Sequence, residues 1–317
     1  MTRRWPLLVS LLPLALGLAT YGMFWRGWAA DFETTLARWF PGERPVATGF
    51  PYRLESELAG VTTGWGSVSA TIDRLRLNRG PWRPELTVMQ GQGVAVSARL
   101  AGLSARVAAT VATASLKLDG GRVARFSLVL PAARGNVGLG PDFAADTLEL
   151  HAREMNVREI TAKAGAGPSL PVQGQLVIGA TGFRLGQGAP IGLAGDIAAR
   201  GGARLADARA WADQGGSLDA VLTGTDATGE VFKLEATLVP LQGGLRLAGT
   251  ITTVCPLSVQ AALNGTAAPA EQRLRAPVRL ALESALPAGG PVALSGIPAD
   301  LATRSRRGQL PACPALR

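Results

Sequence analysis

The stretch VSATIDRLRL, residues 68–77, carries apolar side chains at every second position, at Val68, Ala70 and Ile72. The alternation then slips by one residue and resumes at Leu75 and Leu77. Successive side chains of a β-strand point to opposite faces of a sheet, so a period of two predicts a strand that buries one face. The slip predicts a β-bulge within that strand.

The same alternation recurs along the chain, and turn-forming residues separate the segments, as at 119–121 and 133–136. The further segments are residues 85–89, 93–100, 105–118, 122–130, 146–155, 171–185, 191–199, 216–225, 230–241 and 244–254. The pattern predicts a mainly β fold, a curved and mostly antiparallel sheet or sheets with one or two short helices. The buried positions are mostly Val, Leu, Ile and Ala, so we expect an aliphatic and partly open inner face.

Residues 164–171, AGAGPSLP, have neither charge nor periodicity and divide these segments into two groups. They form either a linker between two similar sheets or a hairpin loop. On the first interpretation, residues 49–163 are one β-sheet half and residues 164–317 are the second, including the C-terminal tail. Within the second half, RLADARAWADQ at 204–214 predicts a helix that ends at Gly215 and Gly216.

The N-terminus contains 21 residues without a charge, from Trp5 to Trp25. At about 1.5 Å per residue a helix of this length spans the hydrocarbon core of a bilayer. Arg3 and Arg4 precede the run and aromatic residues end it, so residues 1–28 are expected to be an inner-membrane anchor, with the bulk of the chain in the periplasm. The alternative is a cleaved secretory signal, whose apolar region is usually shorter.

Residues 29–48 are expected to continue the anchor as an amphipathic helix and a linker. Phe32, Leu36, Trp39 and Phe40 recur at helical spacing before Pro41 and Gly42. This apolar stripe either packs on the following domain or lies in the membrane surface.

Few residues are available for catalysis in this chain. It holds 317 residues with a formal charge of +9 and one histidine, His151, which alternates with Glu149 and Arg153 on a predicted strand. A His-rich metal site is excluded, and a Ser-His-Asp triad would depend on His151 alone. No glycine-rich phosphate loop or paired-carboxylate pattern accompanies it. We therefore expect a protein that is not an enzyme and that uses no cofactor or metal.

The positive charge comes almost entirely from scattered arginines. The densest group, Arg74, Arg76, Arg79 and Arg83, has acidic neighbours and one aromatic residue, Trp82. A nucleic-acid surface usually interleaves cations with several stacking rings. The group therefore favours a solvated sheet face, and we expect no nucleic-acid partner.

Cys255 and Cys313 are the only cysteines. An even number of cysteines in an exported bacterial domain favours a disulfide, whereas the same pair in a cytosolic chain favours buried thiols. A bridge would attach the tail, Leu310 to Arg317, to the sheet.

Three short motifs in a fixed order resemble a known family. An N-terminal anchor precedes Gly49-Phe50-Pro51-Tyr52-Arg53, and residues 211–216, WADQGG, precede strands that end in LRLAG at 245–249. This order is similar to the bacterial family catalogued as domain of unknown function 2125, over nearly the whole chain. The resemblance implies an architecture similar to AsmA-like envelope proteins, in which an anchored β-sheet curls into an apolar groove, and it implies no catalytic residue.

The motif at 49–53 also has a structural interpretation. Pro51 favours an extended chain and restricts Phe50 to the β region, so two rings project from a rigid strand start. We expect Phe50 and Tyr52 to fill the core rather than to contact a ligand.

Two functions follow from these patterns. In the first, the sheet contacts membrane lipid along an apolar groove, to which we assign Val96, Ile178 and Leu222. In the second, the protein is a scaffold of the cell envelope with a closed core, and it docks a partner protein on its sheet edges. A continuous open apolar face favours the first, and a filled interior favours the second.

Overall fold

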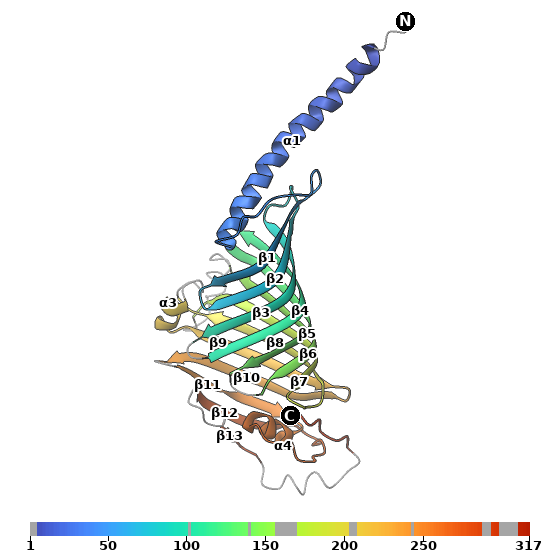
Figure 1. Cartoon of the computed structure of the whole chain (residues 1–317). Helices are drawn as coiled ribbons and strands as arrows, with labels where there is room; N and C mark the ends of the chain where they lie inside the picture. Colours follow the sequence, from blue (N-terminus) through green and yellow to red (C-terminus); the bar gives the residue numbers. More distant parts are fainter. Residues whose placement is uncertain are drawn as a thin grey trace.

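One antiparallel sheet dominates the computed structural model, which describes residues 5–100, 103–138, 141–155, 170–202, 208–241, 244–286, 293–297 and 310–317. Thirteen strands are described, and each pairs with the next in chain order (Figure 1). They are β1 (Leu54–Trp65), β2 (Val68–Arg79), β3 (Leu86–Leu100), β4 (Leu103–Asp119), β5 (Arg122–Val137), β6 (Phe143–Glu154), β7 (Val172–Leu185), β8 (Ile191–Arg200), β9 (Ser217–Asp226), β10 (Gly229–Leu241), β11 (Gly244–Thr253), β12 (Val278–Leu286) and β13 (Ala293–Ser295). Because β1 and β13 do not pair, the sheet is open.

Three helices accompany the sheet in the described part of the chain. They are α1 (Trp5–Trp39), α3 (Ala208–Asp213) and α4 (Pro256–Asn264). The long α1 leaves the sheet at its β1 end, and the C-terminus lies near β12 at the other end (Figure 1). The predicted helix at 204–214 is confirmed over Ala208–Asp213, and residues 203–207 lie outside the described part.

The mainly β prediction is confirmed, with differences at particular elements. The segments at 85–89 and 93–100 form the single strand β3, and the predicted turn at 133–136 is wrong because these residues lie inside β5. Gly135 fits there because the Arg106 carbonyl and the ring of its paired neighbour Phe143 occupy the space that a side chain would need. The two expected halves belong to one sheet, because β6 pairs with β7; residues 156–169, around the expected boundary, lie outside the described part.

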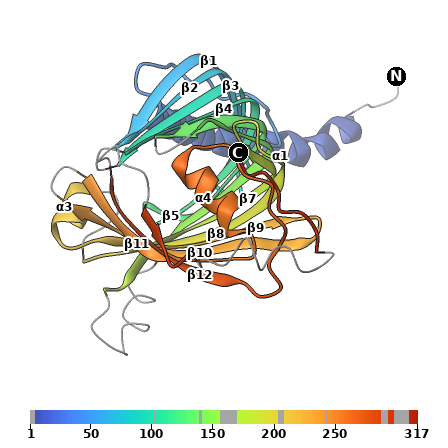
Figure 2. The same ribbon diagram turned by 90° about the horizontal axis from the view of Figure 1, so that it is seen from below.

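The two faces of the sheet differ sharply in polarity. Exposed ion pairs and polar networks lie on the outer face, such as Arg153 with Gln175, and Gln175 with Asp196. The inner face is apolar and carries three buried clusters. Figure 2 shows the sheet bent lengthwise into an open trough with α4 on its inner side. We call this inner face the trough.

A row of special backbone positions crosses the first seven strands. On β2 the inward residues are Ala70 and Ile72 before Asp73, and Leu75 and Leu77 after it. The pairing of β2 with β3 has the same register before and after Asp73. The predicted change in the phase of the alternation is therefore confirmed, but the predicted bulge is wrong. All seven strands change phase at the same row, so β2 has no extra residue relative to its neighbours.

Seven residues aligned by the register form this row, which we call the crease. They are Gly60, Asp73, Gly93, Thr110, Ala132, Asp146 and Gly182. Four of them, on β1, β3, β5 and β7, have positive φ angles between 49° and 66°. A left-handed residue in each alternate strand turns the chain and reverses the side-chain alternation, so apolar groups face the trough on both sides of the crease.

The C-terminal part of α1 packs against the inner face of β1 and β2. Phe32, Leu36 and Phe40 are fully buried there, so the packing interpretation of this stripe is confirmed. Arg79 of β2 lies beneath the helix, 5.0 Å from the Phe32 ring, and donates a hydrogen bond to Thr87. Burial lowers the pKa of Arg79 and the carboxylate of Asp31, 3.8 Å away, opposes this shift.

Among the residues that the structure describes, none of the helices contains a stretch both long and apolar enough to count as a membrane span.

Candidate functional site

The trough contains a continuous apolar row that runs from one strand to the next. Leu150 pairs with Ile178, Gly195 lies between Ile178 and Leu222, and the row continues through Leu234 to Ile251. Paired residues of neighbouring strands share a face. The register therefore brings the candidate groove residues Ile178 and Leu222 together on the inner face, where both are half-buried.

A small apolar cavity of about 220 Å³ lies between this row and α4. Leu222 lines it with Leu234 and Ile251 from the sheet, and Val259 and Leu263 cover it from α4. Leu316 of the C-terminal tail completes the wall. The cavity is lined by carbon throughout, so it offers burial and no polar recognition.

Val96 lies on the same inner face but farther toward the β1 end. It pairs with Ala70 and Val107 and contributes to a shallow depression of about 890 Å³ at the ends of β2–β6. Phe143 also lines this depression and stacks on Phe183, with 5.6 Å between ring centroids. Phe143, Phe183 and Phe232 therefore fill part of a face that the sequence predicted to be aliphatic.

Helices bound the trough at both ends. α1 covers β1 and β2, and α4 covers the face of β8–β11. Between them the second cluster is built from strand residues alone, within the described part of the chain. Among the described residues, the middle of the trough therefore has apolar side chains and no helix over them.

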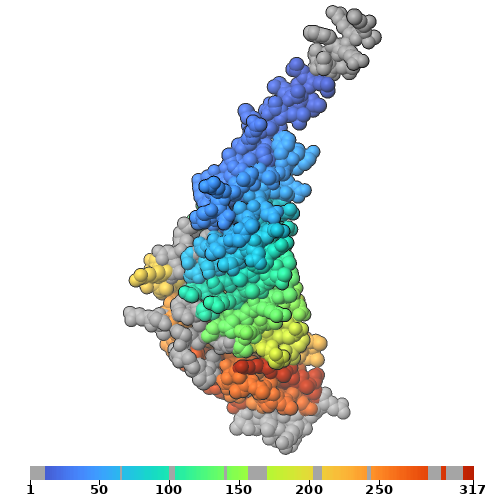
Figure 3. All heavy atoms as spheres, in the orientation of Figure 1, coloured from blue at the N-terminus to red at the C-terminus, as the bar shows by residue number. Residues whose placement is uncertain are grey.

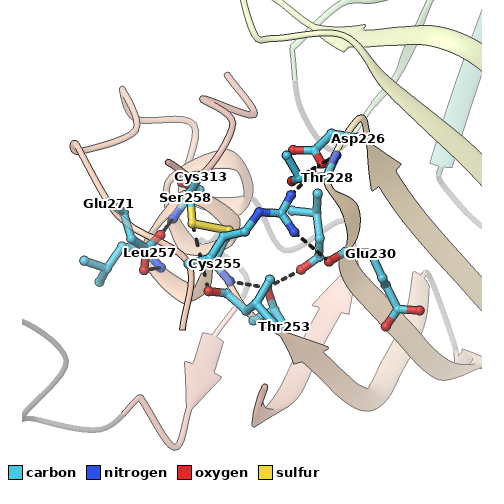
Figure 4. The surroundings of a disulfide bond; sticks show 12 residues. Asp226, Thr228, Glu230, Thr253, Cys255, Leu257, Ser258, Glu271 and Cys313 are labelled. Atoms are coloured by element: carbon cyan, nitrogen blue, oxygen red, sulfur yellow. Dashed lines mark hydrogen bonds and ion pairs between the residues drawn. A yellow bond between two sulfur atoms is a disulfide. The ribbon is translucent and has the colours of Figure 1, made fainter. Parts of the chain in front are cut away.

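The predicted disulfide is present between Cys255 and Cys313 (Figure 4). Cys255 is fully buried at the start of α4, and Cys313 belongs to a tail that pairs with the segment around Gln272. The tail then continues to Ala315, whose carbonyl accepts a hydrogen bond from the Ala189 N–H at 2.6 Å. The bridge thus fixes α4 and Leu316 over the apolar cavity.

Cys255, Glu271 and Cys313 lie close enough together to resemble a metal site. Their chemistry has another explanation, because both sulfurs are bonded to each other. The Glu271 carboxylate accepts hydrogen bonds from the backbone N–H groups of Leu257 and Ser258 at 3.1 and 3.0 Å. Glu271 therefore caps the first turn of α4, where unpaired N–H groups favour a negative charge.

A buried ion pair joins this segment to the β9–β10 turn. Arg273, only 9% exposed, lies 2.6 Å from Asp226 and donates a hydrogen bond to the Glu230 carbonyl. Burial raises the pKa of Asp226, but the hydrogen bonds from Thr228 and the charge of Arg273 outweigh it, so the pKa falls below its usual value. The Asp226 carboxylate is held ionised and attaches the C-terminal segment to the sheet.

The Gly49–Arg53 motif does not fill the core, contrary to the prediction. Phe50 is 53% exposed and Tyr52 79% exposed, because the motif precedes β1 and lies against α1 rather than in the trough. Pro51 follows a cis peptide bond, and its carbonyl accepts a hydrogen bond from the Tyr21 hydroxyl. Gly49 has a φ of 91°, and a side chain there would meet the carbonyl of Arg53, whose guanidinium pairs with Glu55.

His151 lies on the outer face with two potential catalytic partners. Its Nδ1 is 3.0 Å from the Ser127 hydroxyl, and its Nε2 is 3.7 Å from Glu149. About half of each ionisable side chain is exposed to water. A catalytic triad needs groups preorganised where water is excluded, and a flat exposed strand surface does not provide this. We assign the three residues no catalytic role.

The helix α4, which covers the cavity, was not predicted from the sequence. The signal was present: Pro256 occupies the first turn, and Gly265, with a φ of 72°, ends the helix. Proline at the start and glycine just after the end are typical of a helix. The nine residues were too short to show a clear period.

Comparisons of the chain with models of known protein families, with curated proteins and with solved structures find no match.

Proposed function

We propose that this chain is a non-enzymatic envelope protein, anchored in the inner membrane with its bulk in the periplasm, and that its trough contacts lipid. The main support for lipid contact is the apolar row of the trough, which ends in the 220 Å³ cavity beneath α4. The resemblance to the family of unknown function and to AsmA-like proteins agrees with this proposal and stays a prediction.

An alkyl chain suits this site for a simple physical reason. Each methylene group moved from water into an apolar site contributes about 0.8 kcal/mol, without any polar contact. The cavity holds a short part of such a chain, and the row through Leu222 and Ile178 provides a path for the rest. A head group would remain outside, at the wet edge of the sheet.

The proposed anchor is supported by the sequence and by the exposure of α1. The run from Trp5 to Trp25 has no charge. Leu12, Leu14 and Leu16 are each exposed on a helix that projects from the body (Figure 3). Exposed apolar side chains that follow one another along a projecting helix usually contact a membrane or a partner, and a bilayer would bury them.

Photo-crosslinking tests lipid contact in the full chain. A phospholipid with a diazirine in its acyl chain is incorporated into membranes that contain the protein, and crosslinked peptides are mapped after irradiation. Crosslinks on α1 are expected of any anchored protein. Crosslinks on the peptides that contain Ile178 and Leu222 are expected only if lipid enters the trough.

A matched pair of variants sharpens this test. Leu222→Trp fills the cavity, whereas Val221→Trp places the same ring on the exposed outer face. We expect Leu222→Trp to remove most crosslinking at the trough and Val221→Trp to leave it unchanged. Crosslinks on α1 alone in the unaltered chain would reject the lipid-binding trough.

The scaffold function remains the second candidate because α4 already covers part of the trough. Val259 and Ala261 of α4 are buried, and α4 packs on Ile191 and Ile251. In this case α4 is a permanent part of the core, and a partner protein would use the outer face or the strand edges. An unoccupied trough in the crosslinking experiment favours this function.

A further inference from the structure

Six aromatic residues from three separate segments gather where α1 leaves the sheet, and three of them are exposed. α1 contributes Tyr21, Trp25 and Trp28, the segment before β1 contributes Phe50 and Tyr52, and the β2–β3 turn contributes Trp82. We call these six residues the aromatic collar. The three segments are far apart in the sequence, so the fold assembles the group.

Direct ring contacts hold most of the collar together. Phe50 lies 6.1 Å from Tyr21 and 5.4 Å from Trp25, measured between ring centroids. Trp82 lies 6.0 Å from Tyr21 and 5.6 Å from Trp28. These separations are typical of interacting aromatic pairs. The loop and the turn are therefore attached to α1 at a defined height along the helix.

The collar is an unusual surface because the three rings outside α1 remain exposed, whereas the three rings on α1 are half-buried. Trp82 is 66% exposed, in addition to the exposed Phe50 and Tyr52. A cluster that served only to pack the sheet on α1 would bury these rings, as α1 does with Phe32 and Leu36. Large exposed apolar patches usually mark a surface that contacts a membrane or a partner.

Arginine follows three collar residues directly in the sequence: Trp25-Arg26, Tyr52-Arg53 and Trp82-Arg83. All three arginines are exposed, and Arg53 also pairs with Glu55. Tryptophan and tyrosine prefer the interface between the head groups and the hydrocarbon of a bilayer, and nearby cations are attracted to anionic lipids. The combination matches the chemistry of an anionic membrane surface.

We propose that the aromatic collar docks in the head-group layer of an anionic bilayer and holds the sheet upright on it. This inference rests on the anchor of the proposed function, because α1 above the collar is the segment that enters the bilayer. The sheet is then held at two further points, Tyr52 and Trp82, instead of hanging from a single helix. The strands stack away from the membrane, from β1 toward β13.

Depth-dependent fluorescence quenching tests the proposal with the full chain. The native cysteines are joined in the disulfide, so one introduced cysteine gives one labelling site. Leu16→Cys reports on the anchor, and Tyr52→Cys and Trp82→Cys report on the collar. Ala227→Cys is the control, because the exposed β9–β10 turn lies seven strands from β2 at the opposite ends of the strands.

Each variant is labelled with bimane and reconstituted in vesicles of phosphatidylcholine and phosphatidylglycerol that contain brominated lipid. We expect the labels at positions 52 and 82 to be quenched several-fold more than the label at position 227. The combined variant Arg26→Gln, Arg53→Gln and Arg83→Gln should reduce this quenching in anionic vesicles and change it little in pure phosphatidylcholine.

The label at position 16 separates the two ways in which the proposal can fail. Quenching at position 16 without quenching at 52 and 82 overturns the docking of the collar, and leaves the anchor intact. A collar covered by a protein partner would give this result too. An absence of quenching at position 16 rejects the anchor, and the docking proposal with it.

Discussion

Asp73 of β2 lies over Gly93 of β3, and its carboxylate occupies the space that any side chain on Gly93 would need. Asp146 has the same relationship with Gly182, four strands farther along the crease. In each case a strand with a left-handed glycine pairs with a strand that supplies an aspartate. The crease therefore depends on backbone conformation and on the fit between neighbouring strands.

Glycine-to-alanine substitutions can separate these two requirements. The space around Gly60 is open, so Gly60→Ala should cost only the strain of an alanine in the left-handed conformation. We expect a loss of about 1 kcal/mol in the free energy of unfolding. Gly93→Ala has a similar φ and also collides with Asp73, so its loss should be about 2 kcal/mol larger. Denaturant unfolding of both variants measures the difference.

A second-site change provides the control for this prediction. Asp73→Ala should restore part of the stability that Gly93→Ala loses, because it removes the colliding carboxylate. The same change should not restore the stability that Gly60→Ala loses. Equal losses in Gly60→Ala and Gly93→Ala would show that the fit between Asp73 and Gly93 does not matter.

The opposite change is available at Ala132, the crease residue of β5. Its φ of 49° is the only positive value at a non-glycine residue in the described chain. The left-handed conformation costs an alanine about 1–2 kcal/mol, and glycine relieves this at an entropic cost of about 0.4–1 kcal/mol. We expect Ala132→Gly to leave stability unchanged or to raise it by about 1 kcal/mol, measured by thermal or denaturant unfolding. A clear loss would contradict the role assigned to the crease.

The disulfide should stabilise mainly the C-terminal part of the protein. It closes a loop of 58 residues, which corresponds to about 4 kcal/mol in the chain-entropy model. The double variant Cys255→Ala, Cys313→Ala should lose a comparable amount in denaturant unfolding. Hydrogen exchange should accelerate at α4 and at the Ala189 amide, but little at β2 and β3. Uniform acceleration throughout the sheet would contradict a local role.

The pair of Asp226 and Arg273 predicts a dependence of stability on pH. The folded-state pKa of Asp226 is lowered from 3.8, so its stabilisation is present above about pH 4 and is lost as the pH falls through the lower folded value. Protonation then leaves the buried Arg273 without its counter-charge. The protection factors of the Arg273 and Leu274 amides, which correct for the slower intrinsic exchange in acid, should therefore fall as the pH is lowered.

Asp226→Asn provides the reference for this effect. The variant lacks the ion pair at every pH, so the natural chain should be the more stable at pH 7. The difference between the two chains should shrink below pH 4. A difference that stays constant down to pH 2 would show that Asp226 does not control this stability.

The sequence predicted most strands because their alternation is local. It also located the phase change between Ile72 and Leu75, although it could not show that six other strands change phase in the same row. That alignment depends on register, which no single strand contains. The strand β1 was missed because the alternation of residues 54–65 is itself broken at Gly60, inside the crease.

The candidate site was predictable only in part, for a related reason. Period-two alternation placed Ile178 and Leu222 on apolar faces, and the register then joined them through Gly195. The cavity itself depends on α4 and Leu316, which reach it through the disulfide. The Phe50 and Tyr52 rings were misplaced because burial of an aromatic residue next to a proline depends on what lies above it, here α1.

Carboxylates placed in the trough give the last test of its function. Val96, Ile178 and Leu222 are all half-buried on the inner face, whereas Val221 is exposed on the outer face. If lipid occupies the trough, Val96→Asp, Ile178→Asp and Leu222→Asp should each lower lipid crosslinking strongly, because a charge beside an alkyl chain is poorly solvated. Val221→Asp should behave as the natural chain.

Circular dichroism on each variant shows whether the sheet persists. A folded Leu222→Asp chain that still crosslinks normally contradicts lipid binding in the trough. Unfolding of all three inner variants, together with normal behaviour of Val221→Asp and no trough crosslinks in the natural chain, would instead establish a closed core and favour the scaffold.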